Sequence, residues 1–203
     1  MKNIFFDLDG TLLDSSDRLY NLFIDLIPEC KLSKHEYWQL KRSKIDHKQI
    51  IEMYFKNHFF EEFNQEWLKL IESDKYLMFD KLYPDAVYLL QKLQKFNNLY
   101  LVTARQSTEQ LLFELRRFNI ENYFTNILVT NHKFSKKDLI SPYYKSEDIF
   151  ISDTGSDINI GCELGMRTIA VTYGFLSRES LENYTPTYLV DSIQEILQLF
   201  VYL

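Results

Sequence analysis

The sequence has few of the features that mark disulfide-rich or membrane-anchored proteins. Its 203 residues include two cysteines, Cys30 and Cys162, which lie far apart in the chain. A disulfide scaffold would carry more cysteines, so we expect two free thiols in a reducing compartment. No apolar run reaches the ~20 residues that a membrane-spanning helix needs. The first apolar stretch ends at Asp7, which leaves no room for a signal-peptide core. These absences predict a cytoplasmic protein without a membrane partner.

An excess of positive charge is also missing. The chain has 23 lysine and arginine residues against 29 aspartate and glutamate residues, a net charge of −6 at pH 7. Nucleic-acid-binding surfaces need a basic field to meet phosphate groups, so we expect no nucleic-acid partner. Hydrophobic residues make up 46% of the chain, which is enough for a packed core. The length suits one domain of ordinary size or one domain with a large insertion.

Residues 14–82 carry a helical pattern. Apolar residues recur at spacings of three and four from Leu19 to Ile27 and again from Phe63 to Ile71. Ser33 and Glu36 have the spacing of a capping box at a helix start. No segment of this region has the pattern of a strand. We therefore predict an inserted helical subdomain.

The remainder of the chain alternates short apolar runs with helical patterns. Such alternation is typical of right-handed crossovers and a parallel sheet. We predict an α/β fold with a parallel-sheet, Rossmann-like core of residues 1–13 and 83–203, and an inserted α-helical cap of residues 14–82. The predicted strands are residues 3–6, 99–102, 127–129, 149–152 and 168–172, and the predicted helices are residues 85–96, 107–118, 157–164 and 192–201.

The strongest chemical signal follows the first strand, where residues 7–11 read Asp-Leu-Asp-Gly-Thr. Asp7 and Asp9 are two residues apart, so their carboxylates can project toward one point as the strand ends. Two carboxylates beside an apolar strand are costly unless a cation or hydrogen-bond donors compensate them. Gly10 permits a sharp turn that exposes nearby N–H groups. The alternative is a surface turn that these residues merely shape.

Polar residues follow other predicted strands as well. Residues 152–157 read Ser-Asp-Thr-Gly-Ser-Asp, which places Asp153 at a strand end and Asp157 at a helix start. An acid at a helix start is also favoured by the helix dipole alone. Thr103 follows the strand 99–102, and by itself it would be an ordinary turn residue. A lysine run lies between two strands and would usually be a solvated face; its members are Lys133, Lys136 and Lys137.

These signals converge at one edge of the predicted sheet. In open α/β sheets the ligand site lies at the carboxyl ends of the strands. Asp7, Thr103 and Asp153 each follow a different strand at that edge. Two of the five glycines, Gly10 and Gly155, lie in the same turns. The sequence therefore predicts one polar ligand site there.

At these positions the sequence resembles the haloacid dehalogenase superfamily of phosphohydrolases. Residues 5–12 resemble the first family motif and residues 101–105 the second. Lys136 resembles the third, and residues 151–158 resemble the fourth. The helical insertion is similar to the cap of the phosphoglycolate-phosphatase-like subgroup.

Two positions depart from the family pattern. The fourth motif usually has glycine before its first aspartate, and this chain has Ser152. The third motif often has proline after its lysine, and none follows here. Lys133 or Lys137 could therefore serve in place of Lys136.

The resemblance implies a two-step phosphoryl transfer. Asp7 would attack phosphorus and form an aspartyl-phosphate. Asp9 would protonate the leaving oxygen and then activate water. Family members that act as dehalogenases lack this second acid, so dehalogenation is not expected here.

The resemblance also implies a metal site and a phosphate site. Mg²⁺ would be held by the carboxylates of Asp7 and Asp153 and the backbone carbonyl of Asp9. Thr103 and Lys136 would contact the transferring group. Leu8 and Ala104 would supply backbone donors and Gly10 the turn. Asp157 would orient the lysine or a metal-bound water.

The expected reaction is hydrolysis of a small phosphorylated metabolite. A phosphomutase with the same intermediate and a non-catalytic phospho-ligand-binding protein stay open as alternatives. A monomer or a homodimer is expected. Several basic cap residues are candidates to bind a second anionic group of the substrate, although for each of them a solvated helix face or an ordinary surface histidine is the favoured explanation. They are His35, Lys41, Arg42, Lys44, His47, Lys48 and His58.

Overall fold

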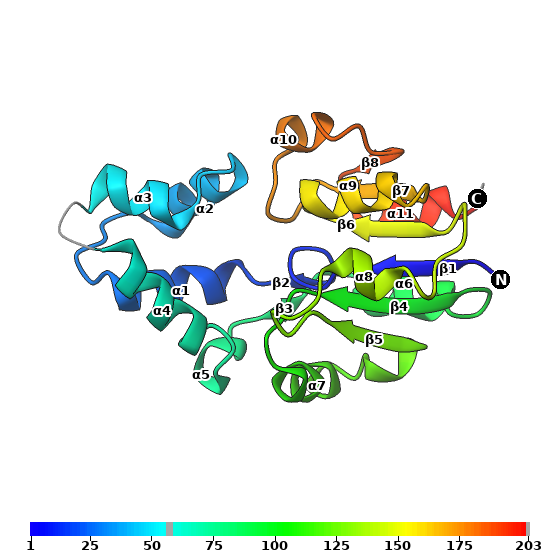
Figure 1. Ribbon diagram of the computed structural model, residues 1–203, viewed down its shortest axis with the longest axis horizontal. Helices are drawn as coiled ribbons and strands as arrows, with labels where there is room; N and C mark the ends of the chain where they lie inside the picture. The colour runs from blue at the N-terminus through cyan, green and yellow to red at the C-terminus, as the bar shows by residue number, and fades with distance from the viewer. Residues whose placement is uncertain (56–58, 202–203) are drawn as a thin grey trace.

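The computed structural model describes residues 1–55 and 59–201, and its centre is a six-stranded sheet (Figure 1). All neighbouring strands in this sheet are parallel, in the order β5-β4-β1-β6-β7-β8. The prediction of an α/β fold is confirmed, and each predicted strand is present. The strands are β1 (Asn3–Phe6), β4 (Asn98–Thr103), β5 (Asn126–Val129), β6 (Ile149–Ser152), β7 (Arg167–Val171) and β8 (Tyr188–Val190).

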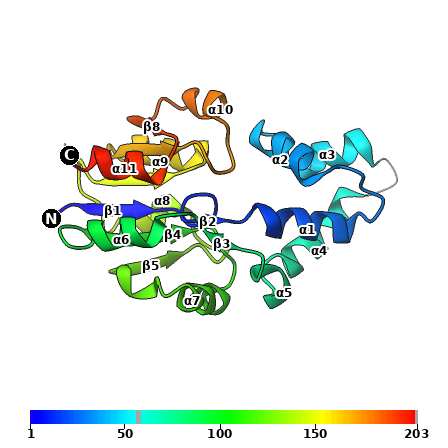
Figure 2. The same ribbon diagram turned by 180° about the vertical axis from the view of Figure 1, so that it is seen from behind.

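Helices cover both faces of the sheet, as the alternation along β1 requires. Ile4 and Phe6 pack on the face covered by α6 (Ala86–Leu93), α7 (Thr108–Arg117) and α11 (Ile193–Leu199). Phe5 packs on the other face, which α8 (Lys136–Ile140) and α9 (Gly155–Glu163) cover. Figure 2 shows α6 and α11 on the near side of the sheet in that view. Each fully buried side chain of this kind stabilises the core by about 1.5–3 kcal/mol.

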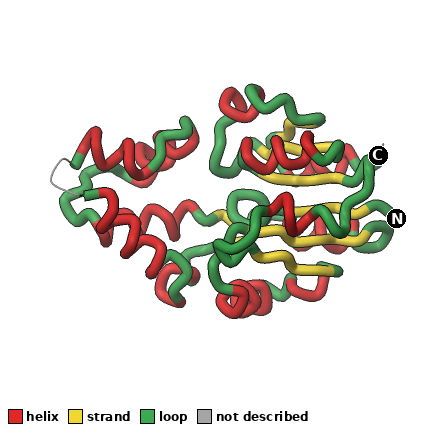
Figure 3. The backbone as a smooth tube through the Cα atoms, in the orientation of Figure 1, coloured by secondary structure: helices red, strands yellow, loops and turns green. Residues whose placement is uncertain are grey.

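A group of helices lies beside the carboxyl ends of the strands and contains no strand of the large sheet (Figure 3). These helices share an apolar core of their own, built around Phe23, Tyr37 and Trp67. The Ser33–Glu36 capping box is present, with Ser33 N–H donating to Glu36 Oε2 at 2.8 Å. The boundaries of the cap at residues 14 and 82 stay a prediction. The helices are α1 (Ser16–Leu26), α2 (Lys34–Arg42), α3 (His47–Tyr54), α4 (Phe60–Leu70) and α5 (Asp74–Leu77).

The expectation that residues 14–82 contain no strand is wrong. Strand β2 (Leu13–Asp14) pairs antiparallel with β3 (Lys81–Leu82), where the chain leaves the core and returns to it. Each strand has two residues, too few to produce a period-two pattern, and the partners are far apart in sequence. The pairing ties the two chain crossings together at the junction.

The remaining observations concern two short helical elements, the cysteines and the search for a membrane-spanning helix. The short elements η1 (Glu121–Tyr123) and α10 (Arg178–Glu182) complete the fold. Cys30 and Cys162 are both free, as expected. In the part of the chain that the structure describes, no helix has the length and apolar character to cross a membrane.

Candidate active site

Asp7 and Lys136 meet at the carboxyl end of the central strand. The backbone N–H of Asp7 still donates to Ile151 O of β6 at 3.0 Å, so this carboxylate is fixed by the sheet. Lys136 is the first residue of α8, whose start is held by a capping box between Ser135 and Asp138. Its Nζ lies 2.5 Å from Asp7 Oδ1 and 2.6 Å from Asp157 Oδ2.

The three candidate lysines differ in their contacts. Lys137 pairs with Glu163 at 2.8 Å on the exposed side of α8 and α9. Lys133 is exposed on the wall of the cavity that also contains Asp7. Lys136, by contrast, bridges two buried carboxylates, and their charges outweigh the effect of burial and raise its pKa.

Asp157 is oriented by a residue whose importance sequence reasoning missed. Ser152 Oγ donates to Asp157 Oδ2 at 2.7 Å and accepts from Thr154 N–H at 3.2 Å. The serine that replaces the family glycine therefore holds the carboxylate that contacts Lys136. Serine in place of glycine at position 152 was the sequence feature that could have indicated this role, since a hydroxyl beside a buried acid is available for a hydrogen bond.

Asp153 follows β6 and is fully buried. Its Oδ2 accepts from Phe175 N–H at 2.6 Å, and its Oδ1 lies 3.4 Å from the Thr11 hydroxyl. Within residues 1–55 and 59–201 it makes no ion pair. Burial, followed by repulsion from Asp7, raises the pKa of Asp153 well above its usual value. Two buried carboxylates that destabilise each other's charge are suited to share a cation.

Glycine is required at the turns that surround Asp153. Gly10 has a φ of +83°, and a Cβ atom there would lie 1.8 Å from Asp153 Oδ2. A Cβ atom at Gly174 would lie 2.3 Å from the same oxygen. The backbone of both loops therefore lies so close to this carboxylate that a side chain at either glycine would clash with it.

The donor set fits a hard divalent cation. Asp7 and Asp153 supply carboxylate oxygens from neighbouring strands, and burial raises the pKa of Asp7 to about 6 despite Lys136. No group of three His, Cys, Asp or Glu side chains that could hold a metal occurs among the described residues. The predicted site needs only two carboxylates, with a backbone carbonyl of Asp9 and water as further ligands.

Thr103 and Ala104 lie where the second motif predicted them. Thr103 ends β4 and is buried, with only 1% of its surface exposed. Both residues line a cavity of about 700 Å³ together with Asp7, Asp9 and Lys136. A cavity of about 790 Å³ lies between α6 and α11, next to Met1, and contains none of the predicted site residues.

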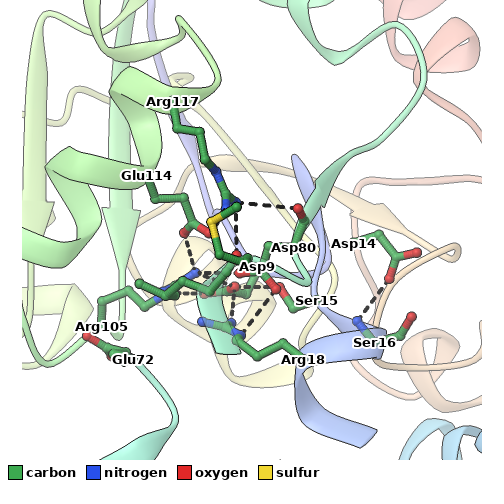
Figure 4. Close-up of polar contacts among 12 residues, drawn as sticks. Asp9, Asp14, Ser15, Ser16, Arg18, Glu72, Asp80, Arg105, Glu114 and Arg117 are labelled. Atoms are coloured by element: carbon green, nitrogen blue, oxygen red, sulfur yellow. Dashed lines mark hydrogen bonds and ion pairs between the residues drawn. The ribbon is translucent and has the colours of Figure 1, made fainter. Parts of the chain in front are cut away.

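Asp9 lies in a buried cluster of charges (Figure 4). Arg105 donates to both carboxylate oxygens, at 2.7 and 2.9 Å, and Arg18 of α1 lies 2.5 Å from Oδ1. Ser15 also donates to Oδ1 at 2.5 Å. Burial alone would raise the pKa of Asp9, but the charges of Arg105 and Arg18 outweigh it and hold the pKa well below its usual value.

The rest of this cluster connects the cap to the core. Asp80, just before β3, lies 3.2 Å from both Arg18 and Arg105. Glu114 of α7 pairs with Arg105 at 2.8 Å and with Arg117 at 3.3 Å. Sequence reasoning assigned no role to these residues because nothing in the sequence indicates that they meet. Arg105 lies within the second motif, which was the only available signal.

The basic cap residues fall into different environments. His35 and Lys48 are exposed, and His58 lies outside the described residues. His47 packs in the cap core, where its Nε2 lies 2.8 Å from the Tyr37 hydroxyl. Lys41 and Lys44 line a cavity between cap and core.

The family model for haloacid dehalogenase-like hydrolases matches residues 4–171. The chain belongs to this family. The prediction of a phosphohydrolase is thereby confirmed at the level of the family, and the relatives agree with it.

Two curated relatives match nearly the whole chain. A pyrophosphatase PpaX from Bacillus mycoides is 24% identical over 97% of this chain and 95% of its own length. A phosphoglycolate phosphatase from Aquifex aeolicus is 26% identical over 89% of each chain.

Solved structures show the same architecture. A haloacid dehalogenase-like hydrolase from Streptococcus pneumoniae superposes with a TM-score of 0.81 at 25% identity, covering 98% of both chains. A predicted phosphatase from Clostridium acetobutylicum has a TM-score of 0.77 at 26% identity, covering 100% of this chain and 99% of its own.

Proposed function

We propose that the protein is a Mg²⁺-dependent phosphatase that hydrolyses a small phosphate monoester through an aspartyl-phosphate on Asp7. The observation that carries this proposal is the arrangement at the end of β1. Asp7 contacts Lys136, at 2.5 Å, and its charge adds to the effect of burial in raising the pKa of a second carboxylate, Asp153. A nucleophile, a fixed positive charge and a second carboxylate that can share a metal ion are what phosphoryl transfer requires.

In the first step, an Asp7 oxygen forms a bond to phosphorus while the bond to the leaving oxygen breaks. Asp9 gives its proton to that leaving oxygen. In the second step, water attacks phosphorus, Asp9 takes the proton, and Asp7 is released with inorganic phosphate.

The contacts of Asp9 limit when it can act as an acid. Arg18 and Arg105 favour its ionised form, which suits the base of the second step. To carry a proton in the first step, the carboxylate has to leave at least one guanidinium group. Because Arg18 belongs to α1 of the cap, movement of the cap can separate the Arg18 guanidinium group from Asp9.

The metal would be held by Asp7, Asp153 and the Asp9 backbone carbonyl. When bound, it would reduce the repulsion between the anionic nucleophile and the anionic phosphate.

The transferring phosphate would be held by side chains and backbone. Thr103 would donate its hydroxyl to a phosphate oxygen, and Lys136 would stabilise the charge of the transferring group. Asp157 would hold Lys136 in place, as its 2.6 Å contact supports. Backbone N–H groups of Leu8 and Ala104, at the turn that Gly10 permits, would complete the phosphate site.

The substrate would be a small phosphorylated metabolite whose leaving group is recognised by the cap. Phosphoglycolate and pyrophosphate, which appear in the names of two relatives, are the first compounds to test. A cytoplasmic location and a monomeric or dimeric state remain predictions.

The test is phosphate release from a panel of small phosphate esters, with Mg²⁺ and with EDTA, using the wild type and Asp7→Asn. We expect release that needs Mg²⁺ and that Asp7→Asn lowers at least ~10³-fold, while circular dichroism shows an unchanged fold. Activity of Asp7→Asn near the wild-type level would remove Asp7 from its role. Absence of release from every ester, together with a stable phosphoryl-enzyme, would favour a phosphomutase, and absence of both would favour a binding protein.

A further inference from the structure

The cap and the core enclose a cavity that continues the active site. It has a volume of about 340 Å³, and its cap side is formed by Lys41, Lys44 and neighbouring residues. Three of its core residues, Thr154, Ser156 and Phe175, also line the cavity that contains Asp7. A ligand whose phosphate lies at Asp7 can therefore extend past these residues to the two lysines.

Lys41 has no counter-charge of its own. In the part of the chain that the structure describes, its ammonium group makes no hydrogen bond or ion pair. The charge of Asp46, which lines the same cavity, acts on it, and that carboxylate accepts from Gln49 N–H at 2.8 Å as the cap of α3. Burial lowers the pKa of Lys41 to about 8. A lysine on a solvated face would show no such effect, since a buried ammonium is costly unless it is paired.

Lys44 is held beside the start of α9 by the core. Its Nζ lies 4.3 Å from the centre of the Tyr184 ring, an attractive cation–π arrangement. The same ring packs so closely on Gly155 that a Cβ atom there would lie 2.0 Å from it. Tyr184 therefore positions Lys44 at the cavity wall.

The position of α2 on the core is fixed by the residue after Lys41. Arg42 donates to Thr172 O at 2.7 Å and to Gly174 O at 2.5 Å, and Arg42 O accepts from Ser177 N–H at 3.1 Å. These contacts attach the end of α2 to the loop that also supports Asp153. Lys41 is thus presented to the cavity by a docked helix.

We propose that Lys41, assisted by Lys44, binds a second anionic group on the leaving-group side of the substrate and thereby selects esters that carry a carboxylate or a second phosphoryl group. This inference rests on the proposed phosphatase function. Three aspartates, Asp7, Asp9 and Asp157, line the catalytic cavity, so a doubly anionic substrate needs additional positive charge. Lys41 and Lys44 supply it at the far end of the ligand.

The test compares substrates that differ in the second charge. Steady-state kinetics would be measured with 2-phosphoglycolate, with pyrophosphate, and with ethyl phosphate, which has a similar size to the first but no second anionic group. For Lys41→Met, we expect the ratio of kcat/KM for 2-phosphoglycolate over ethyl phosphate to fall at least ~10-fold. Lys44→Met should lower it ~3-fold, because an exposed charge is screened, and Lys41→Arg should retain most of the ratio. The pyrophosphate arm shows whether the group selected is a phosphoryl group or a carboxylate.

Lys48→Met is the matched control, since Lys48 is an exposed lysine of the cap on α3. It should leave the ratio within ~2-fold of the wild type. An equal loss on every ester in Lys41→Met, or an unchanged ratio, would overturn the proposal.

A binding measurement separates this proposal from the proposed reaction. In the Asp7→Asn background, calorimetric titration with 2-phosphoglycolate should show a Kd that Lys41→Met raises at least ~10-fold, with no comparable change for ethyl phosphate. If the wild type releases no phosphate from any ester, the phosphatase function fails while this titration still decides the role of Lys41. Equal Kd values with and without Lys41 would overturn the subsite even in an active phosphatase.

Discussion

The surroundings of Asp7 and Asp9 differ strongly, although one residue separates these two carboxylates. Asp7 shares a single lysine with Asp157 and lies near Asp153, and burial raises its pKa to about 6. Asp9 is held by two arginines, and its pKa is well below the usual value. The two carboxylates of this turn therefore lie in environments that shift their pKa values in opposite directions.

The balance of positive and negative charge differs between these two sites. Around Asp7 the negative charge exceeds the positive charge, so a cation would stabilise it. Around Asp9 the cluster sets three carboxylates, Asp9, Asp80 and Glu114, against three arginines, so its formal charges balance. Its hydrogen bonds are incomplete, since burial raises the pKa of Asp80 to about 8 and Asp80 Oδ1 accepts no hydrogen bond from the described residues. The first arrangement suits a bound cation, and the second links cap and core while Asp9 is ionised.

The largest effect is expected from breaking the balanced cluster. Arg105 is 3% exposed and contacts three carboxylates. Arg105→Met leaves these charges buried with too few partners, and it should lower the free energy of unfolding by about 3 kcal/mol or more. Urea denaturation would measure it. Arg116→Met is the control, because Arg116 pairs with Glu121 on the surface and should cost at most ~1 kcal/mol. Similar losses for both variants would show that the cluster does not stabilise the junction.

A somewhat smaller effect is expected on the other side of the comparison. Lys136→Ala removes the positive charge beside Asp7 and should lower kcat at least ~10²-fold. Lys137→Ala, one residue along the same helix, removes only a surface pair with Glu163 and should stay within ~2-fold of the wild type. Both would be assayed on the best ester of the panel. Loss in Lys137→Ala in place of Lys136→Ala would mean that the third motif is shifted by one residue.

The smallest effect is on the pH dependence of the free energy of unfolding, to which Asp7 and Asp9 contribute with opposite signs. In the metal-free protein the pKa of Asp7 is raised to about 6, above the ~3.9 of an unfolded chain. The folded protein then binds more protons than the unfolded chain between these values, so the free energy of unfolding falls as the pH rises through them. In EDTA, Asp7→Asn should therefore be more stable than the wild type at pH 7, and this difference should shrink as the pH falls toward 4.

Asp9 provides the opposite case. Its lowered pKa means that its ion pairs contribute fully above the unfolded value and are lost as the pH falls through the folded value. Asp9→Asn should therefore be less stable than the wild type at pH 7, with the deficit shrinking toward acid pH. Denaturation of both variants in EDTA across this range would check the pair. A stability change of the same sign in Asp7→Asn and Asp9→Asn would show that the two carboxylates do not differ in this way.

Local sequence determined the elements of the core and the place of the site. Apolar runs such as residues 149–152 became strands because both faces of a parallel sheet are covered. The Ser33–Glu36 capping box formed because its partners are three residues apart. Asp7, Thr103 and Asp153 lie at one edge because the carboxyl ends of parallel strands coincide.

Tertiary structure alone decided which residues meet across long distances in the chain. The pairing of β2 with β3, the contact of Arg105 with Asp9, and the placement of Lys41 over the cavity join segments tens of residues apart. Periodicity and capping report neighbours within one element, whereas these contacts depend on how the cap is oriented on the core. That orientation is set by the sum of many packed surfaces, and no local pattern in the sequence records it.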